Sequence, residues 1–470
     1  MKLPRLLSVV CCLFSAVTAR EFMIDTLGTH TQWNPAVAFD GENFLVVWED
    51  FRAGDYSRVH CSRVSPTGQV LDPVGIPVCR AAIDQRDPAI AFDGTNYLVA
   101  WQHWKDGAWS SDIHCVRVSP AREMLDSTSI AVCNASGRQA EPAVSFDGEN
   151  FLVAWHDDRR AQREYDLYAA RVTTAGRVLD STGFVVSAEP GQQMVPAALF
   201  DGGNHLVVWF DGRSGQYDIY GSRVSPDGTV LDPDGIPIST AAYDQWAAAT
   251  AFDGENYLVI WADERLNRVD IYGARVSPQG TVLDPDGIPV ACRNTTRLSP
   301  TLAFRGSDYL GVWSSRNQEE TDLYGAKVSP DGAVGEEVPV AVAPYTQQHP
   351  AVAYGGGEVF VVYKSYTYIV DGKYYGHDRV WGKFGPFPGV EEARNAEFGA
   401  RNPGATIVRG VLRVDLPPAA DRPRQELLDA TGRRVIELQP GANDVRHLSP
   451  GVYFVCSPER REPKRIVLVE

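Results

Sequence analysis

Seven stretches of the chain share one hydrophobic pattern. Each begins at an aromatic residue followed by a polar, Gly-containing turn, continues as an almost wholly apolar segment and ends in a second aromatic residue. The closing aromatic residues recur at intervals of 50 to 54 residues, which indicates an internal repeat. The turns start at Phe39, Phe92, Phe146, Phe200, Phe252, Phe304 and Tyr354, and the closing residues are Trp48, Trp101, Trp155, Trp209, Trp261, Trp313 and Tyr363.

The fifth copy shows how one repeat divides into strands. Asp-Gly and Pro-Gln-Gly turns separate short segments rich in β-branched and aromatic residues, and the second segment is apolar throughout, as in a strand covered on both faces. Four antiparallel strands repeated seven times predict an all-β fold, a seven-bladed β-propeller. The predicted strands of this copy are 250–252, 257–261, 270–276 and 281–290.

The ends of the repeat array predict how the ring closes. The seventh copy ends near Phe384 without a fourth strand, and Phe22-Met23-Ile24 precedes Pro35 by the offset at which Ile76-Pro77-Val78 precedes Pro88. We therefore expect the segment after residue 20 to supply the missing strand, which would cover two exposed sheet edges. The predicted propeller spans residues 20–388.

The repeat disappears after a linker at 389–400. Residues 401–470 contain short strand-like pieces separated by Gly, Pro and Asn turns, a pattern that predicts a small Ig-like β-sandwich.

Four motifs in this segment resemble the C-terminal sorting domain of bacterial type IX secretion cargo. They are Asn402-Pro403, the Leu-Leu-Asp-Ala-Thr-Gly-Arg run at 427–433, Gly-Val-Tyr-Phe at 451–454 and the terminal Lys-Arg-Ile-Val-Leu-Val at 464–469. Gly404 stands where the family has an aromatic residue, and Cys456 is a second departure. The resemblance implies an address read by an outer-membrane translocon; a structural sandwich without a targeting role is the alternative.

The N-terminus and the net charge narrow the compartment and the partners. Lys2 and Arg5, an apolar run at 6–17 and small residues up to Ala19 are typical of a secretory signal peptide at 1–19. No later stretch is apolar enough to be a transmembrane segment. A formal net charge of -16 argues against nucleic acid as a partner. We expect a secreted protein, extracellular or on the outer-membrane surface of a bacterium.

Two cysteine pairs occupy equivalent positions in successive copies. The pairs Cys61 and Cys79, and Cys115 and Cys133, each span 18 residues, which predicts two cross-strand disulfides in an oxidising compartment. A zinc site is the competing interpretation, because a histidine precedes Cys61 and Cys115. Adjacent residues on a strand point to opposite faces, which weighs against shared metal ligation.

A charged motif, Trp-x-Asp-x-Arg, follows the second strand in four copies. In sialidase-like enzymes, arginines and carboxylates on such loops bind and cleave an acidic sugar, but an active site needs different residues from different blades. Recurrence favours an ion pair that locks each blade. The residues are Asp50 and Arg52, Asp157 and Arg159, Asp211 and Arg213, and Asp263 and Arg265.

A second repeated position carries glutamine near the predicted axis. We expect its amide to satisfy loop backbone groups, and Arg297 replaces it in the sixth copy. The glutamines are Gln32, Gln85, Gln139, Gln193, Gln245 and Gln347.

Aromatic residues that break the repeat are the candidates for ligand binding. They belong to copies seven, one and two, which become neighbours when the ring closes, so they are predicted to form one patch for a glycan or protein ligand. Alternatively, each ring packs under its own loop. The candidates are Trp33, Trp104, Trp109, Tyr366, Tyr368 and Tyr374.

The chain lacks a P-loop, a dinucleotide fingerprint, a zinc-protease motif and a nucleophile elbow. The Asp-Pro-Asp-Gly turns at 232–235 and 284–287 have no EF-hand spacing, so neither a metal nor a cofactor is expected. We expect a glycan- or protein-binding propeller without catalysis. The alternatives are a sialidase-like glycoside hydrolase or lyase acting on extracellular polysaccharide, which needs a nonrepeating carboxylate pair at the axial pocket, and a structural surface protein.

Overall fold

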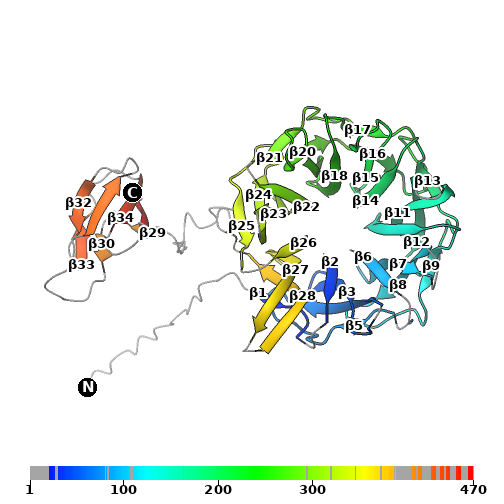
Figure 1. Ribbon diagram of the computed structural model, residues 1–470, viewed down its shortest axis with the longest axis horizontal. Coiled ribbons are helices and arrows are strands. Elements are labelled where there is room, and N and C mark those ends of the chain that lie inside the picture. The colour runs from blue at the N-terminus through cyan, green and yellow to red at the C-terminus, as the bar shows by residue number, and fades with distance from the viewer. Residues whose placement is uncertain are drawn as a thin grey trace, which may run out of the picture. The chain divides into compact units, whose positions relative to one another are not determined.

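The computed structural model describes residues 21–387 apart from short gaps in loops (27–29, 55, 80, 82–83, 106–109, 162–163, 293–294, 318–319, 344–345, 371–372 and 386), and seven strands between 405 and 468. The chain divides into two units, Thr18–Val390 and a second that contains Glu391–Glu470. All described regular elements are strands. Seven four-stranded sheets surround a common axis in the first unit, which is therefore a seven-bladed β-propeller (Figure 1).

Blades 1 to 4 each take four consecutive strands, numbered from the axis outwards. Blade 1 contains β2 (Gln32–Phe39), β3 (Phe44–Asp50), β4 (Arg58–Val64) and β5 (Ile76–Pro77). Blade 2 contains β6 (Gln85–Phe92), β7 (Tyr97–Trp104), β8 (Ser111–Val118) and β9 (Ile130–Cys133). Blade 3 contains β10 (Gln139–Phe146), β11 (Asn150–Ala161), β12 (Glu164–Thr173) and β13 (Phe184–Ser187). Blade 4 contains β14 (Gln193–Phe200), β15 (His205–Asp211), β16 (Asp218–Val224) and β17 (Ile236–Ser239).

Blades 5 and 6 follow the same order, and blade 7 differs. Blade 5 contains β18 (Gln245–Phe252), β19 (Tyr257–Asp263), β20 (Asp270–Val276) and β21 (Ile288–Ala291). Blade 6 contains β22 (Thr296–Phe304), β23 (Tyr309–Asn317), β24 (Glu320–Val328) and β25 (Val338–Ala341). Blade 7 contains β26 (Gln347–Gly355), β27 (Glu358–Val370), β28 (Lys373–Phe384) and, at its outer edge, β1 (Glu21–Met23).

Local turn chemistry explains the innermost hairpin of each blade. In blade 1, the Asp40 carboxylate accepts hydrogen bonds from the amides of Glu42 and Asn43, and Gly41 adopts a φ of 99° that favours glycine. In blade 5, the first strand begins five residues before the predicted start. The fourth strand is shorter than predicted, because turns occupy most of 277–287 and leave only a bridge between Val276 and Val282.

The core lies between successive blades. Six tryptophans and Tyr363, the aromatic residues that close the repeat motif, are all 0% exposed. Trp155 of blade 3, for example, packs with Leu98 and Ile113 of blade 2. The recurrence of one large aromatic residue per copy thus follows from the need to fill seven equivalent interfaces.

In blades 1 to 5, a repeated arginine on the third strand connects the blade to the next one. Arg223 pairs with Asp232 in a bidentate contact (Nε–Oδ2 2.8 Å, Nη2–Oδ1 2.9 Å), and its Nη1 donates to the carbonyl of Pro278 in the following blade at 3.4 Å. The same arrangement recurs at Arg63 and Asp72, Arg117 and Asp126, Arg171 and Asp180, and Arg275 and Asp284.

The N-terminal strand closes the ring. β1 runs antiparallel to β28, with Glu21 opposite Lys383 and Met23 opposite Trp381, and the amide of Ile24 donates to the carbonyl of Val380 at 3.0 Å. Blade 7 therefore joins the first and last strands of the propeller, the position expected for β1 from the sequence.

The predicted disulfides are wrong for this structure: Cys61, Cys79, Cys115 and Cys133 are free thiols. The strand register explains the error. In blade 2, Ile130 lies opposite Cys115, whereas Cys133 lies opposite Ile113, two positions away. In blade 1, Ile76 lies opposite Cys61. The two cysteines of a blade therefore do not face each other across its strands. No cluster of His, Cys, Asp or Glu within the described residues is arranged to hold a metal ion.

The second unit contains a five-stranded sheet in the order β29-β35-β34-β31-β32 and a two-stranded sheet of β30 and β33. The Ig-like sandwich and the sorting domain stay predictions. The signal peptide 1–19, the linker 389–400 and Asn402-Pro403 lie outside the described residues. No described helix is long and apolar enough to span a membrane. The strands are β29 (Ala405–Val408), β30 (Val411–Val414), β31 (Gln425–Asp429), β32 (Arg434–Leu438), β33 (Gly441–Asp444), β34 (Gly451–Cys456) and β35 (Lys464–Leu468).

Candidate functional site

A β-bulge interrupts the innermost strand of every blade at the same place. In β2 the register shifts between Trp33 and Ala36, and Asn34 adopts a left-handed φ of 46°. Such bulges re-aim a side chain. The equivalent left-handed residues, with φ between 50° and 55°, are Asp87, Glu141, Val195, Ala247, Ser299 and His349.

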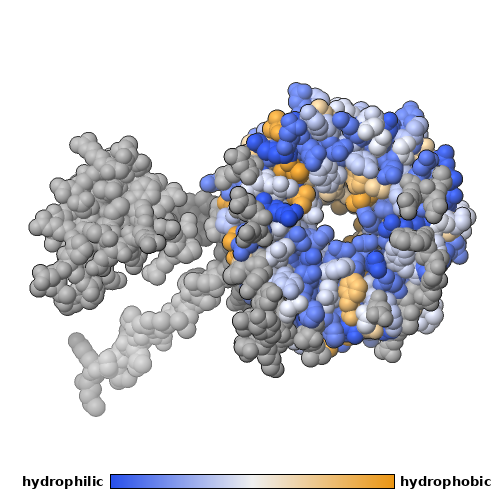
Figure 2. Space-filling view, viewed as in Figure 1, coloured by the Kyte–Doolittle hydropathy of each residue, from blue (hydrophilic) through white to orange (hydrophobic). Residues whose placement is uncertain are grey.

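The bulged residues surround a pocket on the propeller axis. Its volume is about 280 Å³, and its walls are Asn34, Asp87, Glu141, Val195, Ser299 and His349, each with the proline that follows it. The pocket lies at the end of the blades where Gln32 is opposite Asp50, the face that carries the β3–β4 loop and its equivalents. Figure 2 shows the opening, with hydrophobic residues beside β14 and hydrophilic residues on the side of β2 and β6.

Blades 1 and 2 contribute an acidic wall. The side-chain amide of Asn34 donates to Glu49 Oε1 at 2.8 Å and to Asp87 Oδ1 at 2.9 Å, and the backbone amide of Asp87 donates to Glu49 Oε1 at 2.8 Å. Burial, together with the charge of Asp87, raises the pKa of Glu49 to about 7. Burial also raises the pKa of Asp87.

Glu141 of blade 3 extends this wall. Burial and the charge of Asp87 raise the pKa of Glu141 to about 7. Among the described residues, none donates a hydrogen bond to its carboxylate, although it lines the pocket and is half-buried. This half-buried carboxylate therefore presents to the pocket a hydrogen-bonding capacity that no described residue uses.

The two arginines near these carboxylates, Arg86 and Arg138, contact other partners. Arg86 pairs with Asp84 at 2.6 Å, and the guanidinium groups of Arg86 and Arg138 lie 5.4 and 5.2 Å from the Trp104 ring centre. The amide of Gln102, in the orientation that satisfies its neighbours, donates to Asp87 Oδ2 at 3.1 Å and accepts from Trp104 Nε1 and Arg138 Nε. Trp104 thus joins blade 2 to blade 3.

Trp33 occupies the opposite side of blade 1, next to blade 7. Its Nε1 donates to Asp378 Oδ2 at 2.9 Å, Lys364 Nζ lies 5.7 Å from its ring centre, and the side chain is 39% exposed. Burial and the charge of Lys364 lower the pKa of His349, so the imidazole is neutral at neutral pH.

The structure therefore separates the predicted aromatic patch into parts. Trp33 contacts blade 7, whereas Trp104 packs between arginines of blades 2 and 3. Tyr366 is half-buried on β27, and its amide donates to the carbonyl of Thr346. Trp109 lies outside the described residues, as do the side chains of Tyr368 on β27 and Tyr374 on β28.

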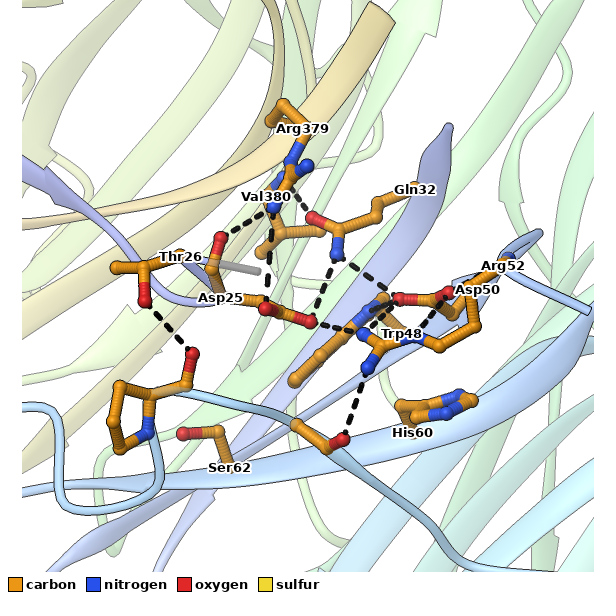
Figure 3. Close-up of polar contacts among 12 residues, drawn as sticks. Asp25, Thr26, Gln32, Trp48, Asp50, Arg52, His60, Ser62, Arg379 and Val380 are labelled. Carbon is orange, nitrogen blue, oxygen red and sulfur yellow. Dashed lines mark hydrogen bonds and ion pairs between the residues drawn. The ribbon is translucent and has the colours of Figure 1, made fainter. Parts of the chain in front are cut away.

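The Trp-x-Asp-x-Arg residues lie inside their blades. In blade 1, Asp50 is 0% exposed, accepts from Trp48 Nε1 at 3.0 Å and pairs with Arg52 at 2.6 Å; Arg52 also contacts Asp25, which follows β1 (Figure 3). Equivalent pairs form at Asp157 and Arg159, Asp211 and Arg213, and Asp263 and Arg265, with separations of 2.5 to 2.7 Å. Because these carboxylates are paired, they are unsuited to act on a ligand in the pocket.

The glutamine ring is also internal. The Gln32 Oε1 atom accepts from the amide of Val380 in blade 7, and Gln85 Oε1 accepts from Val59 in blade 1, both at 3.0 Å (Figure 3 shows Gln32). In the sixth copy, Arg297 is 1% exposed and pairs with Asp270 and Glu337 instead. These two glutamines connect neighbouring blades.

The sequence contains a signal for the pocket beside the repeated glutamine position. Two residues after each glutamine or Arg297, the residue type changes in every copy, and a proline follows this residue in six of the seven copies. Asn34, Asp87 and Glu141 were not predicted as site residues, because they belong neither to a repeated charged motif nor to the extra aromatic residues. The change of residue type between the recurring glutamine and the recurring proline marks the position that lines the pocket.

Solved structures resemble the chain only distantly. No family model and no curated protein matches the chain. A thermostable family-43 glycoside hydrolase is similar in structure, with 14% identity, a TM-score of 0.34 and coverage of 54% of this chain and 96% of its own. The sialidase of Trypanosoma rangeli gives 10% identity and a TM-score of 0.40, covering 67% and 56% of the two chains. A prolyl endopeptidase gives 12% and 0.45, covering 93% and 54%. At these values the likenesses carry no argument about activity.

Proposed function

We propose that the propeller binds an extracellular glycan and receives one of its sugar units in the axial pocket. The observation that supports this most strongly is the ring of bulged residues. The bulged position carries a different residue type in each of the seven blades, and in six of them this residue lines the pocket. Six chemically different side chains thus meet at one place on the propeller axis, as a site for a shaped polar ligand requires.

The pocket suits a sugar in size and chemistry. Its volume of about 280 Å³ is at the small end of ligand sites and is comparable to one sugar ring. Asn34, Asp87 and Glu141 offer an amide and carboxylates to hydroxyl groups, while Val195 provides an apolar surface for the carbon-bound hydrogens. Trp33 exposes part of its ring beside Asn34, where a second sugar unit can stack.

A glycan array probed with the purified full-length protein tests the proposal. We expect binding to a restricted set of glycans, at least tenfold weaker in Asp87→Asn and in Trp33→Ala. Glu149→Gln is the matched control, because this exposed residue lies in the β10–β11 turn. Glycan binding that both pocket variants leave unchanged would exclude the axial pocket, and an array without any bound glycan would refute the function.

Glycoside hydrolysis is the second candidate, favoured by the nonrepeating carboxylates at the pocket. Such hydrolysis uses one protonated and one ionised carboxyl group. A protonated Glu141 would donate its proton to the departing glycosidic oxygen, while Asp87 takes a proton from the water that forms the new bond to the anomeric carbon. Release of labelled sugar from an oligosaccharide, abolished in Glu141→Gln, would support hydrolysis; binding without turnover would leave the binding function alone.

We propose further that residues 401–470 direct export through a type IX translocon and display the propeller at the cell surface. The support is the order of motifs between Asn402 and Val469. A fusion of residues 391–470 to a periplasmic reporter tests this address in a host with type IX secretion. Surface or extracellular reporter is expected, and periplasmic retention would contradict the proposal.

A further inference from the structure

The pocket has a strongly uneven distribution of charge. Two carboxylates, Asp87 and Glu141, line one side of the pocket, and a third, the buried Glu49, accepts hydrogen bonds from Asn34 and from the Asp87 backbone amide. The bulged residues of blades 4 to 6 are Val195, Ala247 and Ser299, which carry no charge, and blade 7 contributes the neutral His349. A ligand in the pocket therefore meets negative potential from one direction.

The surrounding cations leave this potential incompletely compensated. Arg86 pairs with Asp84 and stacks on Trp104, and Arg138 stacks on the same ring and donates to Tyr165 and Gln102. On the far side, Lys364 lies 3.6 Å from Asp378. None of these three cations forms an ion pair with Glu49 or Glu141 among the described residues.

The surroundings of Glu141 indicate which chemical group of a ligand would bind in the pocket. Its carboxylate lines the pocket and accepts no hydrogen bond from the described residues, whereas Glu49 and Asp87 are already bonded to Asn34. An ammonium group is a compact cation with three donors, so one such group reaching Glu141 would supply both the charge and the hydrogen bonds. A neutral hydroxyl supplies only the hydrogen bond.

We infer that the axial pocket selects a sugar unit with a free ammonium group, such as a glucosamine unit, and that Glu141 and Asp87 bind the ammonium. This inference rests on the proposed glycan function and specifies its ligand. The pyranose ring would lie toward Val195 and Ser299, with the amine directed to the carboxylates of blades 2 and 3.

Matched oligosaccharides provide the test. Titration calorimetry on the full-length protein at pH 7 compares chitotriose with free amines to its fully N-acetylated form, which has the same length and no charge. We expect the free-amine form to bind at least tenfold more tightly, with the preference shrinking as salt rises. In Glu141→Gln and in Asp87→Asn, the ratio of the two affinities should approach one, while Glu149→Gln should keep the wild-type ratio.

The possible outcomes distinguish a failure of the ammonium site from a failure of the proposed glycan binding. Equal binding of the two oligosaccharides, or a preference that both pocket variants keep, overturns the ammonium site while glycan binding stands. Absence of binding to either oligosaccharide, with other glycans bound on the array, also overturns the ammonium site. If no glycan binds at all, the proposed function fails together with the inference. Thermal melting of each variant verifies that it is folded.

Discussion

Restoring the consensus glutamine in blade 6 should destabilise the protein. Arg297 is almost fully buried, and its guanidinium binds Glu337 through Nε at 2.9 Å and Nη2 at 3.0 Å, and Asp270 through Nη1 at 3.3 Å. Arg297→Gln removes the cation and leaves two buried carboxylates. Trp313 Nε1 continues to donate to Glu337, and Arg268 to Asp270.

The expected magnitude follows from the burial of the partners. Removal of one member of a buried ion pair costs about 3 to 5 kcal/mol, because the remaining charge is neither solvated nor paired. Asp270 keeps Arg268, so the loss should be at the lower end, about 3 kcal/mol. The double variant Arg297→Gln, Glu337→Gln removes the uncompensated charge on Glu337 and should recover most of this loss.

Urea unfolding followed by tryptophan fluorescence measures these differences. Arg316→Gln is the matched control, since this exposed arginine of the same blade should contribute less than about 0.5 kcal/mol. An Arg297→Gln variant as stable as the wild type would refute the reasoning. It would mean that the glutamine of the other copies fits blade 6 without help from the acidic partners.

Three further predictions concern pH, closure and the blade contacts. Burial raises the pKa of Glu141 from 4.5 to about 7, so the folded protein favours the protonated carboxyl group. Stability is therefore highest below pH 4.5 and falls as the pH rises through 7, where the half-buried carboxyl group ionises. Glu141→Gln should therefore raise the free energy of unfolding at pH 8 by at most about 3 kcal/mol, and by less where solvent in the pocket screens the charge. At pH 4.5 the substitution should change this free energy little. Urea unfolding that shows the larger gain at pH 4.5 would contradict the prediction. Deletion of residues 20–26 removes β1 and Asp25, so calorimetry should show a strongly lowered melting temperature; an unchanged value would argue against closure by β1. Arg223→Ala should cost about 1 kcal/mol in urea unfolding, whereas the exposed Arg177→Ala should cost nothing measurable, and equal effects would refute the interblade role of Arg223.

The propeller was predictable because its signal is repeated. An Asp-Gly turn recurs in five copies, and an apolar strand that ends in tryptophan recurs in six, so an error in one copy is corrected by the others. The third strand of the fifth copy was predicted with its observed bounds, whereas the first was too short, because Gln245 to Ala249 lack the alternation that marks a strand.

The pocket and the cysteines depend on details that the repeat does not contain. Val195 and Ala247 are not residues that favour a positive φ, so their bulges arise from blade geometry and not from local propensity. The cysteine pairing failed because the strand register places Ile130 opposite Cys115 and Cys133 opposite Ile113, two positions away. The partnership of Arg297 with Glu337, 40 residues away, is likewise set by the fold.

The closing strand makes folding of the ring dependent on both ends of the propeller. Each blade from 1 to 6 pairs only strands that follow one another in sequence, whereas Glu21 and Lys383 meet across 362 residues. Local blades form quickly, but this long-range pair adds the entropy of closing a long loop. A chain interrupted before β28 would leave the blade 1 core around Trp48 uncovered and β1 without a neighbour. Ring closure thus distinguishes complete chains from truncated ones: only the former can bury all seven blade interfaces.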